Sequence, residues 1–106
     1  MWILQGGETD AETMTFRIPP GAIKTVGRAS RADFIVDAAL VSRLHCRLTA
    51  TEERIDVEDL QSTNGTFVND ARVERAALVS GDRLRVGRVA FNVEKRDDGR
   101  SRDGEG

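Results

Sequence analysis

Short stretches of alternating apolar and polar residues follow one another along this chain, and turn-forming residues separate them. A period of two recurs, as in residues 14–18, where Met, Phe and Ile alternate with Thr and Arg. No window of ten or more residues keeps the 3.6-residue period of an amphipathic helix. The pattern therefore predicts an all-β protein.

We expect about ten or eleven short, mainly antiparallel strands, a number typical of a β-sandwich. The first two should form a hairpin around Gly6-Gly7 and the acidic loop 8–12, because glycine and charged residues end a strand. The last two should form a hairpin that pairs with the N-terminal strand. The expected strands cover residues 2–5, 14–18, 23–26, 34–36, 46–51, 55–57, 66–68, the segment around Val73, 78–79, 84–86 and 89–93.

The length of 106 residues fits one domain, which we place at residues 1–96. Residues 97–106 contain only Gly, Asp, Arg, Ser and Glu and are expected to form a disordered C-terminal tail. Sixteen basic and eighteen acidic residues give a net charge of −2, and the four acids and two arginines of the tail account for it. A neutral body argues against nucleic acid or an anionic membrane as the partner.

The sequence contains no recognisable membrane span, signal peptide, disulfide or metal-binding motif. No apolar stretch approaches the roughly 18 residues of a membrane span, and the N-terminus lacks a basic region and a cleavage site, so we expect no membrane insertion and a cytoplasmic location. One cysteine, Cys46, and one histidine, His45, offer neither a disulfide nor a set of metal ligands. We expect no metal and no cofactor.

Three short segments carry the candidate chemistry: Gly27-Arg28, 42–45 (Ser-Arg-Leu-His) and 62–66 (Ser-Thr-Asn-Gly-Thr). Each lies in a predicted turn between two apolar runs, where a rigid β-scaffold presents side chains to a ligand. Together they offer guanidinium, hydroxyl and amide groups, which suit an anion such as a phosphate. Taken singly, each also fits an ordinary surface turn, and Asn-Gly occurs in many hairpins.

The three segments, in this order and spacing, resemble the forkhead-associated (FHA) domain, which binds phosphothreonine peptides, and the resemblance covers roughly residues 2–95. It implies an eleven-strand SMAD/FHA-like β-sandwich with its binding loops at one end. It also implies a threonine-phosphorylated partner protein, an upstream Ser/Thr kinase, and a role in signalling or assembly. We expect this chain to act as a monomer.

By the same resemblance, each candidate residue receives a role. The expected phosphate contacts are Arg28, Ser42, Arg43 and Thr63, although many relatives have Asn at the position of Arg43. Asn64 is expected to hold the peptide backbone. Gly27, His45 and Gly65 should support the loops, with His45 buried and Gly27 allowing the backbone to turn.

Two further residues are candidates for sequence specificity. The resemblance places Leu40 where relatives often contact the third residue after the phosphothreonine, so an apolar preference is expected there. Arg31 adds positive charge to the rim, unless it is only a solvated surface residue. Thr9, between Glu8 and Asp10, is a conceivable phosphorylation site, although an inert loop is the simpler interpretation.

Two other classes of function stay open at this stage. A phosphate-independent assembly domain could use the same sandwich for protein contacts, with the loops playing no part. An enzyme fits less well, because the sequence contains no nucleophile elbow, metal cluster or phosphate-binding loop of the nucleotide-hydrolase type. A binding module that makes and breaks no bond is the best interpretation.

Overall fold

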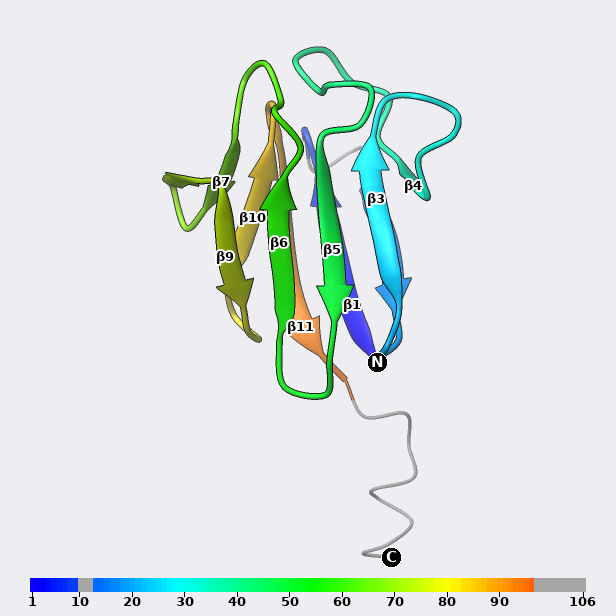
Figure 1. Ribbon diagram of the computed structural model, residues 1–106, viewed down its shortest axis with the longest axis vertical. Coiled ribbons are helices and arrows are strands. Elements are labelled where there is room, and N and C mark those ends of the chain that lie inside the picture. Colours follow the sequence, from blue (N-terminus) through cyan, green and yellow to red (C-terminus); the bar gives the residue numbers. More distant parts are fainter. Residues whose placement is uncertain (10–12, 97–106) are drawn as a thin grey trace, which may run out of the picture.

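The computed structural model describes residues 1–9 and 13–96, which form a two-layer β-sandwich (Figure 1). Eleven strands lie in these residues, and the predicted all-β fold is confirmed. They are β1 (Trp2–Gly7), β2 (Met14–Ile18), β3 (Ile23–Gly27), β4 (Phe34–Ile35), β5 (Cys46–Ala50), β6 (Ile55–Asp59), β7 (Thr66–Val68), β8 (Ala71–Val73), β9 (Arg75–Leu78), β10 (Arg83–Val86) and β11 (Val89–Lys95).

The strands divide between a six-stranded sheet, in the order β2-β1-β11-β10-β7-β8, and a five-stranded sheet, in the order β4-β3-β5-β6-β9. Among the described residues, β3 and β4 pair in parallel and the other neighbours pair antiparallel. The predicted pairing of the last hairpin with the N-terminal strand is confirmed, because β11 lies between β10 and β1 with Leu4 opposite Val93.

The core lies between the two sheets and consists of the inward residues of the alternating pattern. Trp2 is 1% exposed, and its indole N–H donates to the Thr51 carbonyl at 2.8 Å. Phe16 stacks on Phe34 with ring centroids 4.5 Å apart. Burying each large apolar side chain stabilises the fold by about 1.5–3 kcal/mol, and these contacts hold the sheets as a rigid platform for the loops.

Several predicted strand boundaries differ from the observed ones, and the end of the first strand is the most informative case. Gly6 and Gly7 belong to β1 rather than to the loop that follows it. A Cβ atom on Gly6 would lie 2.0 Å from the Ala90 carbonyl oxygen, so a glycine is needed where β1 meets β11. From the sequence alone Gly6 suggests a turn, but in the structure it allows two backbones to approach closely.

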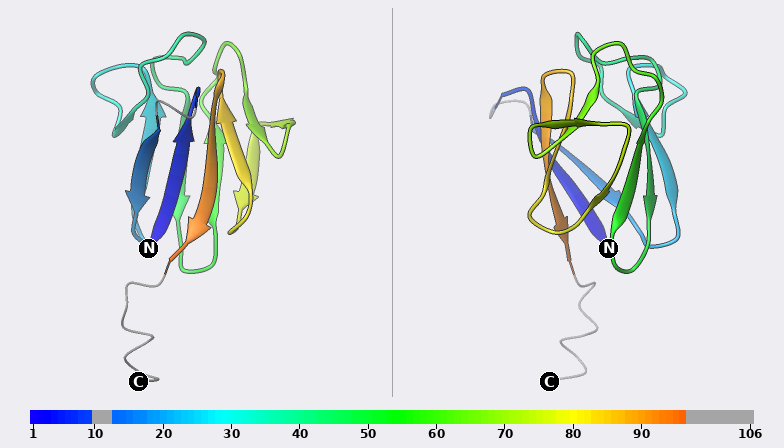
Figure 2. Two further views of the ribbon diagram at one scale, coloured as in Figure 1. Left: turned by 180° about the vertical axis from the view of Figure 1, so that it is seen from behind. Right: turned by 60° about the vertical axis from the view of Figure 1, so that its left-hand side comes forward.

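The three motif segments lie at one end of the sandwich (Figures 1 and 2). They follow β3, precede β5 and connect β6 to β7, so the strand directions bring them together. The turn between β10 and β11 lies at the same end, whereas the N-terminus lies at the other (Figure 1). The predicted disordered tail, 97–106, falls outside the described residues.

Candidate functional site

Backbone hydrogen bonds join the three loops into one surface. The Arg28 N–H donates to the Ser42 carbonyl at 2.9 Å, and the Ala29 N–H donates to the Arg43 carbonyl at 3.1 Å. The Thr63 N–H donates to Ser42 Oγ at 3.0 Å. The β3–β4, β4–β5 and β6–β7 loops are therefore held in a fixed arrangement before any ligand binds.

A hollow of about 430 Å³ opens between these loops. Arg28, an exposed side chain, donates from Nε to the Val41 carbonyl at 3.1 Å, which orients the guanidinium and leaves its two terminal amino groups for a ligand. The lining consists of Arg28, Ala39, Leu40, Val41, Ser42, Thr63 and Asn64. It includes one cation and no acidic residue, which suits an anion.

Two hydroxyl groups accompany Arg28 in this hollow. Ser42 Oγ already accepts from the Thr63 N–H, so its own O–H remains to donate to a ligand. Thr63 is exposed beside it. Arg43 and Arg31 are also exposed at this end, but neither lines the hollow.

Asn64 has a structural bond that the sequence did not reveal. Its Nδ2 donates to the Leu40 carbonyl at 3.0 Å, across 24 residues of chain. Leu40 has a φ of 73°, in the left-handed region that a leucine rarely adopts, and its side chain is 44% exposed. Asn64 thus holds a strained residue in place and keeps its amide oxygen and one N–H for a peptide.

His45 connects two of the loops from below. It is fully buried, and its Nδ1 accepts from the Ser42 N–H at 3.0 Å. Nδ1 is an acceptor, so a neutral ring carries its proton on Nε2, which lies 2.8 Å from the Gly65 carbonyl oxygen and donates to it. His45 therefore does not contact a ligand itself. It fixes the backbone positions of Ser42 and Gly65, which belong to two different loops.

The structure requires a glycine at positions 27 and 65 for two different reasons. A Cβ on Gly27 would lie 2.0 Å from the Arg43 carbonyl oxygen, so Gly27 permits a close approach within β3 rather than the expected turn. Gly65 has a φ of 95°, which glycine adopts at no steric cost. Its N–H donates to Ser62 Oγ at 3.0 Å.

Asp59, at the end of β6, organises the β6–β7 loop from inside, and our sequence reasoning missed it. Its carboxylate accepts from the Ser62 N–H at 3.1 Å, from Ser62 Oγ, and from Thr66 Oγ1 at 2.7 Å. The sequence did contain a signal for this role. Asp59 stands three residues before the Ser62-Thr63 turn, which is the spacing at which an Asp side chain accepts a hydrogen bond from a nearby backbone N–H.

We expect Asp59→Asn to lower the free energy of unfolding by about 1–3 kcal/mol at pH 7, because an amide replaces an acceptor of three hydrogen bonds. Burial raises the pKa of Asp59, but the bonds from Ser62 and Thr66 outweigh it and hold the pKa below its usual value near 3.8. A lowered pKa stabilises the fold above that value, and the contribution is lost as the pH falls below about 4.

Denaturant unfolding of both proteins between pH 7 and pH 2 tests this expectation. The wild type and Asp59→Asn should differ most at neutral pH and converge in acid. Comparing the two removes the effect of other carboxylates with lowered pKa values, namely Asp33 and Glu58. A difference that is the same at every pH would contradict the assigned role.

Cys46 lies next to His45 in sequence but faces the core. It is fully buried, and burial, with a smaller effect from Asp59, raises the pKa of its thiol to about 12. The thiolate is therefore scarce near neutral pH. Together with the two occupied ring nitrogens of His45, this leaves no activated nucleophile in the segment 42–46.

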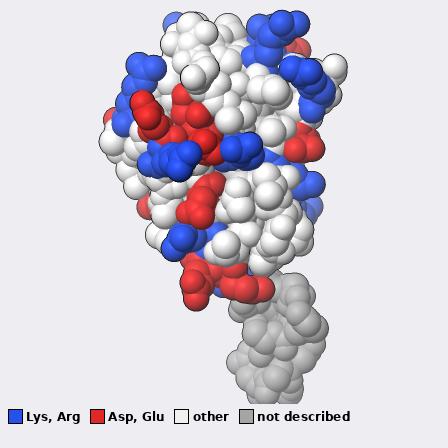
Figure 3. Space-filling model, in the orientation of Figure 1, with Lys and Arg blue, Asp and Glu red and all other residues white. Residues whose placement is uncertain are grey.

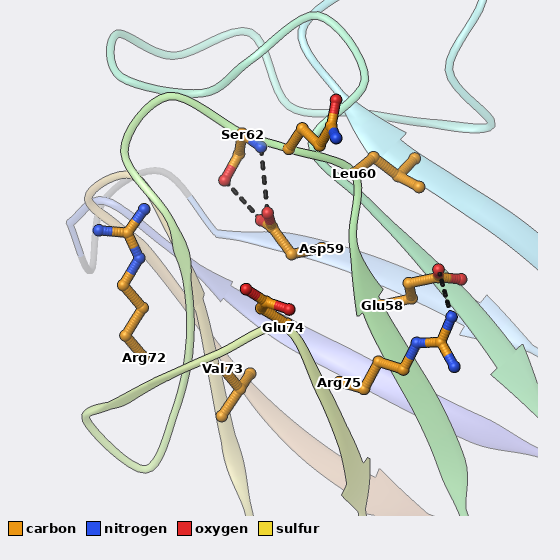
Figure 4. A pocket seen from close by; sticks show the side chains of 9 residues that line it. Glu58, Asp59, Leu60, Ser62, Arg72, Val73, Glu74 and Arg75 are labelled. Carbon is orange, nitrogen blue, oxygen red and sulfur yellow. Dashed lines mark hydrogen bonds and ion pairs between the residues drawn. The ribbon is translucent and has the colours of Figure 1, made fainter.

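A larger hollow, about 970 Å³, lies on the other side of the β6–β7 loop (Figure 4). Its charged groups are largely engaged with one another or with the loop: Glu58 pairs with Arg75 at 3.2 Å, and Asp59 binds Ser62. Within residues 1–9 and 13–96, no group of three or more His, Cys, Asp or Glu side chains could hold a metal ion.

A family model described as the FHA domain matches residues 24–87, more than half of the chain, and includes all three motif segments. The chain belongs to the FHA-domain family. In the part of the FHA chain that the structure describes, no helix is long and apolar enough to cross a membrane.

Relatives and solved structures agree with this assignment. Over 76 residues, 72% of its length, the chain is 41% identical to the ABC transporter ATP-binding/permease protein Rv1747 of Mycobacterium tuberculosis, but it spans only 9% of that protein. The FhaA FHA domain, solved in complex with the intracellular domain of Rv3910, has a TM-score of 0.79 and 32% identity, with 89% of this chain and 100% of that chain covered.

A second solved FHA domain, described for its phosphothreonine-dependent interactions, has a TM-score of 0.76 and 31% identity. The superposition covers 91% of this chain and 97% of that chain. FHA domains are phosphopeptide-binding modules, and the fold and the binding-loop segments of this chain are those of the family.

Proposed function

We propose that this FHA domain binds phosphothreonine in a partner protein, with Arg28, Ser42, Arg43 and Thr63 as the phosphate contacts. The observation that carries the proposal is the hollow in which Arg28, Ser42 and Thr63 meet, held together by hydrogen bonds and free of acidic residues. A phosphate dianion there meets one oriented guanidinium and two hydroxyl groups. Arg43 lies outside the lining, and in this proposal its exposed side chain contacts the phosphate from the rim.

Local charge, rather than a basic surface, supplies the attraction. Figure 3 shows acidic and basic side chains interspersed over one face of the sandwich. Sixteen basic and eighteen acidic residues leave the whole chain near neutrality. A ligand with a concentrated charge, such as a phosphate, therefore suits this chain better than an extended polyanion.

The peptide around the phosphothreonine is expected to lie over Asn64 and Leu40. Asn64 keeps an amide oxygen and one N–H, the donor and acceptor that a peptide backbone requires. Leu40 lines the hollow and is 44% exposed, which supports an apolar preference at the third residue after the phosphothreonine. Arg31 lies outside the lining and is at most a rim contact.

Gly27, His45 and Gly65 act as supports in this proposal, and the domain extends over residues 1–96. Binding proceeds without catalysis, since the segment 42–46 holds no activated nucleophile. A cytoplasmic location, where Ser/Thr kinases find ATP, fits such a function. A kinase upstream, and a role in signalling or assembly, follow from a phosphorylated partner.

Calorimetry with three peptides of one sequence tests the proposal. The phosphothreonine peptide should bind, the unphosphorylated peptide should not, and the phosphoserine peptide should bind about 4-fold more weakly, because one buried methyl group is worth about 0.8 kcal/mol. Equal binding with and without phosphate would instead favour the phosphate-independent assembly domain. In an oriented peptide library, dominance of Asp at the third position would contradict the role of Leu40.

A further inference from the structure

The turn between β10 and β11 packs against Leu40, one of the residues that line the hollow. Gly87 in this turn is buried and has a φ of 60°. A Cβ on Gly87 would lie 3.0 Å from the Leu40 carbonyl group and 3.2 Å from Leu40 Cβ. The turn therefore touches the same Leu40 that lines the hollow, although the two residues are 47 positions apart in the sequence.

Arg85 fixes the position of this turn. Its Nη1 donates to the Gly87 carbonyl at 3.1 Å, and its guanidinium lies 4.0 Å above the centre of the Phe67 ring. Phe67 belongs to β7, directly after the β6–β7 loop, and is paired with Arg85 in the sheet. The turn is thus anchored to the strand that follows the binding loop, as well as to Leu40.

Arg88 is the next residue of the turn, and its side chain is exposed. Since consecutive Cα atoms are about 3.8 Å apart, its backbone lies one residue beyond the contact with Leu40. Acidic partners engage other arginines of the scaffold, namely Arg47, Arg54, Arg75 and Arg96. Arg88 makes no ion pair with the described residues, so its charge is available to a ligand.

We propose that Arg88 binds a carboxylate of the partner at the fourth or fifth residue after the phosphothreonine. The inference rests on the proposed function, because Leu40 then faces the third residue and the β10–β11 turn borders the peptide beyond it. Arg88 is a specificity residue: phosphate capture by Arg28 does not require it. The preferred partner segment is a phosphothreonine followed by an apolar residue and then by Asp or Glu.

Two phosphothreonine peptides test this inference, both with Leu at the third position, one with Asp-Asp and one with Asn-Asn at the fourth and fifth. The wild type should bind the acidic peptide about 2- to 5-fold more tightly at low salt, the range for an exposed ion pair. The preference should shrink in 0.5 M salt. Arg88→Gln should bind both peptides equally, and Arg88→Glu should favour the neutral one.

Arg17→Gln is the matched control, because Arg17 is exposed on β2 and opposite Ile3, towards the other end of the sandwich. It removes the same charge and should keep the wild-type preference. If Arg88→Gln keeps that preference, or weakens both peptides to the same extent, the inference is overturned. Failure of the proposed function would look different, since peptides with and without phosphate would then bind alike.

Discussion

Arg28→Ala should weaken binding of a phosphothreonine peptide by roughly 10- to 150-fold, because a charged hydrogen bond is worth about 1.5–3 kcal/mol. Arg28 is the cation that lines the hollow, and its Nε bond to the Val41 carbonyl orients the guanidinium. Removing it leaves two hydroxyl groups in the hollow, and Arg43 outside its lining, to face a dianion. Calorimetry with wild type and variant at one ionic strength measures the loss.

Two further variants separate geometry from charge. Arg28→Lys keeps the charge but loses the planar fork of donors and the bond to Val41, so it should recover only part of the affinity. Arg31→Ala removes a neighbouring cation outside the hollow and should change the affinity by less than about 5-fold. If Arg28→Ala binds as well as wild type, the proposed phosphate site is wrong.

His45→Ala should lower the free energy of unfolding by about 3–5 kcal/mol and remove most phosphopeptide binding. The change leaves a cavity and two unpaired backbone groups, the N–H of Ser42 and the carbonyl of Gly65. These groups belong to two different binding loops. Denaturant unfolding gives the stability, and titration at low temperature, where the variant is folded, gives the affinity.

Cys46→Ala is the matched control for this experiment. It truncates the neighbouring side chain, which is also fully buried but belongs to the hydrophobic core. Stability should fall while the affinity of the folded protein stays near wild type. Normal affinity in folded His45→Ala would show that His45 stabilises the fold without shaping the loops.

Local chemistry made much of the fold predictable. Alternation with a period of two identified strands such as β2, since each strand must bury one face. The three motif segments were also recognisable from residue type and spacing alone. These features depend on neighbours within a few residues.

Other features depend on residues that meet only after folding. The sequence could not tell that Gly6 lies close to the Ala90 carbonyl inside a sheet, or that Gly27 lies close to the Arg43 carbonyl. It also gave no sign of the Asn64 bond to the Leu40 carbonyl.

The sequence by itself thus determined a β-sandwich of short strands, a neutral body and the residue types of an anion site. Only the tertiary structure decided which of those residues share one hollow and that the β10–β11 turn contacts Leu40, which lines it. The physical reason is that strand alternation and turn chemistry act over a few residues. The hollow instead arises from close contacts and hydrogen bonds that span between 13 and 47 positions of chain.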